Sequence, residues 1–145
     1  MSIHMLKGVL FSALLLVAAV WDIRKREIPD WLSLLVLLTG FMGIRYDSFL
    51  GLVLTGLPYL IAAVLPSKTS FSMGGGDIKL MAACGFVLGV WGGVFQSIAS
   101  LTLALAAGFG ICALRKDKKL STITLPLAPF FCAGGFFSYC LMLSL

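Results

Sequence analysis

Charged residues are scarce in this sequence. Asp, Glu, Lys and Arg make up only 12% of its 145 residues, about half their share in an ordinary soluble domain, whereas 60% of the residues are hydrophobic. A soluble fold of this length could not bury so much apolar surface, so we expect the chain to lie in a lipid bilayer. The net charge of +5 is then expected to come from basic loops near anionic lipid, and no nucleic-acid partner is expected.

Residues that bind metals are also few. Histidine occurs once, as His4, and none of the four cysteines belongs to a C-x-x-C pair. Because a zinc site needs clustered Cys or His ligands, we expect no metal and no cofactor, and we interpret the cysteines as small packing residues. No Ser or Cys has a His partner within the apolar segments, which argues against a catalytic triad.

The sequence consists instead of apolar segments separated by charged loops. Its longest uncharged run, residues 80–114, contains 35 residues. As one helix this run would be about 52 Å long, whereas a hydrocarbon core is about 30 Å thick, so we expect it to turn back near the glycines of residues 90–94. The pattern predicts an all-α, polytopic membrane protein that forms a single domain over residues 1–145, a bundle of about six transmembrane helices.

The basic residues predict how this bundle is oriented. With six spans, three loops share one side of the membrane and hold nine of the eleven Lys and Arg residues. Basic residues are enriched in the cytoplasmic loops of membrane proteins. We therefore expect these loops to face the cytoplasm and both termini to be extracytoplasmic.

Two acids, Asp22 and Asp77, occupy positions that favour chemistry. Asp22 ends the first predicted helix, and Asp77 follows three glycines at the start of the fourth, so both are expected at the cytoplasmic boundary. Acids at membrane depth are costly and need a reason. Each also has a local interpretation, since Asp22 could pair with Arg24 and Asp77 could cap its helix. A cap does not need the glycines, which suit a backbone that passes close to a peptide substrate.

Two neighbouring carboxylates support one kind of hydrolysis without a cofactor. Repulsion between like charges prevents both from ionising easily, so the pair shares one proton. The ionised member takes a proton from water, and the protonated member donates to the peptide carbonyl that the water attacks. We therefore predict that Asp22 and Asp77 are catalytic.

The other acids have simpler interpretations. Asp30 follows Pro29 and is expected to be the N-cap of the second helix. Glu27 is expected to pair with the basic residues beside it. Asp47 and Asp117 lie in polar loops, where we expect solvated charges.

Three segments resemble the motifs of type IV prepilin peptidases. DIRKREIPD (22–30) is similar to their first aspartate motif, MGGGDIKL (73–80) to M-G-x-G-D-x-K-L, and ITLPLAPFFCAGG (123–135) to the Pro-x-x-Pro-Phe segment of the last helix. The resemblance covers nearly the whole chain, with the motifs in the same order. It implies a membrane aspartic endopeptidase that removes the short, basic leader of type IV prepilin or pseudopilin precursors. The cleavage would occur at the cytoplasmic face of a bacterial or archaeal inner membrane.

Matched position by position, the resemblance implies that Asp22 and Asp77 are the catalytic pair. The other motif positions, expected to approach the substrate or to support the site, are Ile28, Pro29, Gly74, Gly75, Gly76, Lys79, Pro126 and Pro129. Longer members of the family carry a methyltransferase portion, often with two C-x-x-C pairs. This sequence resembles the short, peptidase-only branch, such as the tight-adherence (Flp) pilus peptidases, and no methyltransferase domain is expected.

Two alternatives remain open from the sequence. A presenilin-like intramembrane protease also uses G-x-G-D and two aspartates, but this sequence has Trp-Asp in place of Tyr-Asp and lacks Pro-Ala-Leu. A non-enzymatic small transporter or assembly protein could use Asp22 and Asp77 as an intramembrane acidic site. That alternative gives the I-P-D motif and the glycine run no shared purpose.

Overall fold

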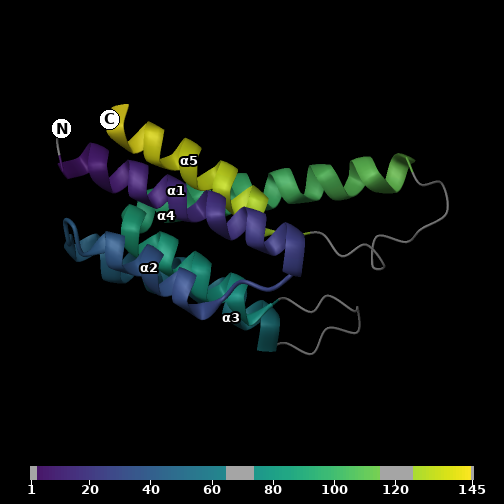
Figure 1. Ribbon diagram of the computed structural model, residues 1–145, viewed down its shortest axis with the longest axis horizontal. Helices are drawn as coiled ribbons and strands as arrows, with labels where there is room; N and C mark the ends of the chain where they lie inside the picture. Colours follow the sequence, from purple (N-terminus) through teal and green to yellow (C-terminus); the bar gives the residue numbers. More distant parts are fainter. Residues whose placement is uncertain (1–2, 65–73, 115–125, 145) are drawn as a thin grey trace.

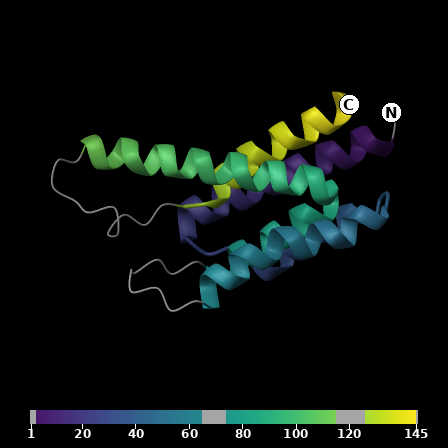
Figure 2. The same ribbon diagram turned by 180° about the vertical axis from the view of Figure 1, so that it is seen from behind.

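The protein is described by a computed structural model that places residues 3–64, 74–114 and 126–144. All regular secondary structure in these ranges is helical, which confirms the all-α prediction. The helices are α1 (Ile3–Lys25), α2 (Asp30–Gly40), α3 (Tyr46–Val64), α4 (Gly75–Leu114) and α5 (Ala128–Ser144). They form one elongated bundle in which the start of α1 and the end of α5 lie at the same end (Figures 1 and 2).

The number of helices differs from the predicted six. The described ranges hold five elements, because α4, residues 75–114, comprises two helical parts that meet at a break at Gly89. Gly89 has φ 76° and ψ −172°, a backbone conformation that is essentially restricted to glycine. The part of α4 after Gly89 runs back along the bundle, opposite in direction to the part before it (Figures 1 and 2). The chain therefore turns one residue before the predicted stretch.

Helix length and composition fit a membrane-embedded protein. Among the described residues, three stretches are long and apolar enough to cross a bilayer: Met5–Lys25, Tyr46–Val64 and Gly75–Ile111, the last of which is broken at Gly89. α2 and α5 are shorter, with 11 and 17 residues. Large apolar side chains such as Val9, Leu16 and Phe49 point outward from the bundle. Lipid can cover such side chains. Helices tolerate this environment because their backbone hydrogen bonds are satisfied internally.

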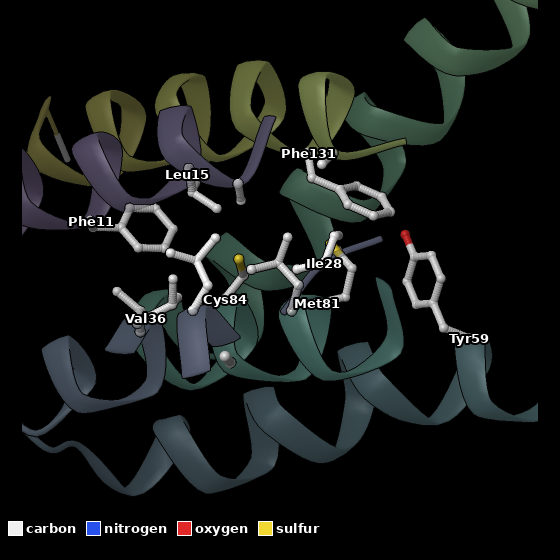
Figure 3. Close-up of a cluster of buried hydrophobic side chains, with 14 residues drawn as sticks. Phe11, Leu15, Ile28, Val36, Tyr59, Met81, Cys84 and Phe131 are labelled. Carbon is white, nitrogen blue, oxygen red and sulfur yellow. The ribbon is translucent and has the colours of Figure 1, made fainter. Parts of the chain in front are cut away.

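The core of the bundle is built from all five helices and the link between α1 and α2. Figure 3 shows side chains that meet between the helices: Phe11, Leu15, Ile28, Val36, Tyr59, Met81, Cys84 and Phe131. Cys84 packs there as the sequence predicted, whereas Cys140 on α5 is exposed. The Phe131 ring meets the Tyr59 ring edge-on, with 5.9 Å between centroids. This contact joins α5 to α3.

Glycine brings α3 and α4 into backbone contact. A Cβ added at Gly51 would collide with the carbonyl oxygen of Gly85. The hydroxyl oxygen of Thr55 lies 2.7 Å from the carbonyl oxygen of Gly51 and 3.1 Å from that of Met81. Small residues and interhelical hydrogen bonds drive helix association in lipid, where apolar burial between helices contributes little. These contacts fix the first part of α4 and therefore the position of Asp77 in its first turn.

Gly89→Ala is predicted to destabilise the protein, because a residue with a Cβ is strained at the backbone angles of Gly89 by about 1–3 kcal/mol. The matched control is Gly110→Ala, since an added Cβ at Gly110 meets nothing within 4 Å among the described residues. Unfolding in mixed micelles with increasing SDS measures the difference. Gly89→Ala should unfold at lower SDS than the wild type, and Gly110→Ala should not. Equal midpoints for the two variants would contradict the role of Gly89.

Candidate active site

Asp22 and Asp77 line one pocket, which lies where α1 ends and α4 begins. Its volume is about 240 Å³. The residues that line it are Asp22, Arg26, Glu27, Ile28, Gly74, Gly75, Gly76 and Asp77. All of them belong to residues 22–30 or 73–80, the two segments that the sequence analysis selected. The pocket also includes Arg26 and Glu27, which the sequence analysis had assigned no place in a site.

Asp22 reaches the pocket from the last turn of α1 and is only 6% exposed. Its Oδ2 atom accepts a hydrogen bond from the backbone N–H of Ala128, at 3.0 Å. Ala128 is the first residue of α5, where backbone N–H groups have no partner within the helix and the helix dipole attracts an anion. α5 therefore holds the carboxyl group of Asp22 in place from the far end of the sequence.

The prolines of the third motif lie on either side of Ala128 in the sequence. Pro126 precedes α5, and Pro129 occupies its first turn, where a missing N–H is tolerated. The amides of Phe130 and Phe131 donate to the carbonyl oxygen of Leu127, at 3.0 and 3.1 Å. Neither proline lines the pocket. They lie instead at the start of α5, the segment that presents the Ala128 amide to Asp22.

Asp77 enters the pocket from the first turn of α4. Its backbone N–H donates to the carbonyl oxygen of Gly74 at 3.0 Å, which begins the helix. The side chain is half-buried and lies close enough to Asp22 for their charges to interact. The structure therefore brings together the two acids that the sequence analysis paired, from two helices that are distant in the sequence.

The three glycines before Asp77 have different surroundings. A Cβ added at Gly76 would lie 2.9 Å from both the Cβ atom and the carbonyl oxygen of Ile28, which is too close. A Cβ at Gly75 would meet nothing within 4 Å among the described residues, and one at Gly74 would meet Asp77 Oδ2 at 3.5 Å. Packing thus requires glycine only at Gly76. Gly74 and Gly75 leave the wall of the pocket open.

The prediction that Asp30 caps α2 is wrong. Asp30 is the first residue of the helix, and the cap position before it is Pro29, without a side-chain hydrogen bond. The Asp30 carboxylate instead forms a salt bridge with Lys79, with 2.7 Å between Oδ2 and Nζ. The two residues belong to different motifs, and their spacing in the sequence gave no signal that they meet. The bridge gives Lys79 a partner, which the sequence analysis could not supply.

The described ranges contain no group of three or more His, Cys, Asp or Glu side chains that could hold a metal ion. The pocket itself offers the chemistry of its carboxyl groups, with Arg26 also in its lining. A pair of carboxyl groups, one of them fixed by a backbone amide, is suited to moving protons to and from a bound water molecule.

Comparison with known proteins supports the resemblance of the motifs. The model of the type IV leader peptidase family matches residues 9–143. The prepilin leader peptidase/N-methyltransferase of Bacillus subtilis (strain 168) is 31% identical over 144 residues, which cover 95% of this chain and 56% of that relative. The chain thus spans about half the length of the curated relative it matches. No solved structure matches the chain.

Gly76→Ala is predicted to destabilise the site, because its Cβ would push against Ile28 and overpacking typically costs about 1–3 kcal/mol. Gly75→Ala, one residue away, is the matched control and should leave the stability unchanged or slightly raised. The melting temperature of the purified protein in detergent measures both. A melting temperature for Gly76→Ala equal to that of Gly75→Ala would show that the contact with Ile28 is not close-packed.

Proposed function

Because the chain belongs to the type IV leader peptidase family, we propose that it is a membrane aspartic endopeptidase. Its substrate is the leader of a type IV prepilin or pseudopilin precursor, a class that the name of the Bacillus subtilis relative supports. The observation that carries the aspartic mechanism is the single pocket that Asp22 and Asp77 share. Both acids lie in segments that resemble the aspartate motifs of the family.

In the proposed reaction, Asp22 and Asp77 hold one proton between them and bind a water molecule. The ionised carboxylate takes a proton from the water, and the protonated acid donates its proton to the carbonyl oxygen of the scissile peptide bond. The water oxygen adds to the carbonyl carbon, and the C–N bond then breaks as the leaving nitrogen takes a proton from the pair. Because close carboxyl groups titrate as a unit, the shared proton belongs to the pair.

The surroundings of the two acids support different parts of this reaction. Asp22 is buried and fixed by the Ala128 amide, so its carboxyl group can keep one orientation while the substrate binds. Asp77 is more accessible. It follows Gly74 and Gly75, which line the pocket without side chains and so leave this side of it open. We propose that the extended backbone of the substrate passes over these two glycines and presents its peptide bond between the acids.

We propose that the pocket faces the cytoplasm of a bacterial or archaeal cell. The end of the bundle that contains the pocket also carries a group of basic residues: Arg24, Lys25, Arg26 and Lys79. At the other end, where α1 and α3 begin, the part of the chain that the structure describes contributes Lys7 and Arg45. The enrichment of basic residues in cytoplasmic loops supports this orientation, with the start of α1 and the end of α5 on the extracytoplasmic side.

Neither alternative function gains a specific observation from the structure. A transporter or an assembly protein could also use a pair of acids. However, the pocket combines Ile28 of the I-P-D motif with the glycine run before Asp77, and a shared substrate site explains this combination directly. Family membership favours a leader peptidase over a presenilin-like protease.

Asp22→Asn and Asp77→Asn are each predicted to lower the cleavage of a prepilin at least about 100-fold, because the pair can no longer move a proton to and from water. The substrate is a pilin-like precursor from the same genome, co-expressed with the protein, and the loss of the leader is measured as a size shift on a gel. Asp47→Asn, at the far end of the bundle in the first turn of α3, is the control and should cleave normally.

Full cleavage by either of the first two variants would contradict the aspartic mechanism. If the wild type cleaves none of the pilin-like precursors of its genome, the proposed substrate is wrong.

A further inference from the structure

Two contacts join the segment after Asp22 to the segment that carries Asp77. The first is the packing of Gly76 against Ile28, where no space remains for a side chain. The second is the salt bridge between Lys79 and Asp30. Both contacts connect the same two parts of the chain, the link that leads from α1 into α2 and the first turns of α4. The I-P-D motif (residues 28–30) and the G-x-G-D-x-K motif (residues 74–79) therefore form one interface, which we call the joint.

Lys79 does not line the pocket, although it follows Asp77 by only two residues. Positions two apart on an α-helix differ by about 200° around the axis, so Lys79 and Asp77 leave the helix on nearly opposite sides. A bond to Lys79 thus acts on the rotation of the first turn of α4. A rotation of this turn about its axis would move the Asp77 carboxyl group relative to Asp22.

The stability of α4 itself does not explain a lysine at this position. The N-terminal turns of a helix carry a partial positive charge, which disfavours a cation there. Asp30, in contrast, lies in the first turn of α2, where an anion is favoured. The favourable interaction of Lys79 is therefore the one with the Asp30 carboxylate, on the other side of the joint.

The salt bridge is accessible to solvent, with side-chain exposures of 56% for Lys79 and 72% for Asp30. Exposed ion pairs contribute little to the stability of a whole fold. Loss of the bridge should therefore leave the bundle folded and act on the local geometry of the site. A loss of activity without a loss of stability would therefore distinguish a positioning role from a merely structural one.

We propose that Lys79 is a positioning residue, which acts through its salt bridge with Asp30 to keep the Asp77 carboxyl group turned toward Asp22. The inference rests on the proposed peptidase function and specifies how that same site is assembled. Gly76 and Ile28 set how closely the two segments approach, and the bridge sets the rotation of α4 at this distance.

A charge exchange tests the proposal in the full-length protein. Lys79→Glu and Asp30→Lys each place like charges opposite one another, and each is expected to lower kcat for prepilin cleavage about tenfold, because small misplacements of reacting groups are costly. KM and the melting temperature should stay close to the wild-type values. The double variant Asp30→Lys/Lys79→Glu restores an attraction and should recover most of the lost kcat. Arg24→Glu makes the same change of charge as Lys79→Glu near the pocket end and should keep the wild-type kcat.

Wild-type kcat in Lys79→Glu, or no recovery in the double variant, would overturn the inference. An equal loss in Arg24→Glu would also overturn it, since the effect would then come from net charge.

A second measurement does not depend on cleavage. In a cysteine-free background, the rate at which Asp77→Cys reacts with a water-soluble maleimide reports how this position faces the pocket. Lys79→Glu is expected to change this rate several-fold, and the exchange with Asp30→Lys should restore it. Unchanged labelling would overturn the positioning role and leave the peptidase proposal intact. Restored labelling in the exchange variant, together with a wild-type protein that cleaves no prepilin, would instead show that the proposed function fails while the contact between the two segments holds.

Discussion

The hydrogen bond from the Ala128 amide to the Asp22 carboxylate is the contact on which the site depends. A carboxylate buried at the end of a membrane helix is costly unless a donor meets it. The first turn of α5 supplies that donor, and a second buried contact holds this turn, because the Gln96 side chain donates to the Phe131 carbonyl oxygen at 3.0 Å. Through Gln96, the returning part of α4 places α5, and α5 places Asp22.

Asp77 is positioned by a different set of contacts. Backbone packing between Gly51 and Gly85 fixes α4 against α3, and the Ile28–Gly76 contact brings the start of α4 against the link that follows α1. The Asp22 carboxyl group is thus held by the start of α5, and Asp77 by the packing of α4 on α3. The joint between residues 28–30 and 74–79 connects the link after α1 to the start of α4. A pocket at such a junction can keep its acids close and still have an open side for a peptide.

The sequence predicted the parts of this arrangement that rest on hydrophobicity and on side-chain chemistry. The helical fold, the turn within the long apolar run and the pairing of Asp22 with Asp77 followed from run length, glycine and the cost of acids in lipid. Ala128 could not be found in this way, because its backbone amide makes the contact and its side chain carries no signal. Asp30 was assigned to a cap because local sequence favours one, and only the tertiary structure brings Lys79 within reach. The helix count differed because the two helical parts that meet at Gly89 follow one another without a loop and count as one element, α4.

The central claim is that Asp22 and Asp77 face each other across one pocket, and cross-linking tests it most directly. Both would be replaced by cysteine in a background from which the four native cysteines are removed, and the protein treated with a short bis-maleimide in detergent. The account predicts an intramolecular cross-link between positions 22 and 77, seen by mass spectrometry, and none between positions 22 and 47, which lie at opposite ends of the bundle. Failure of the 22–77 pair to cross-link, while each cysteine alone reacts with a single maleimide, would contradict it.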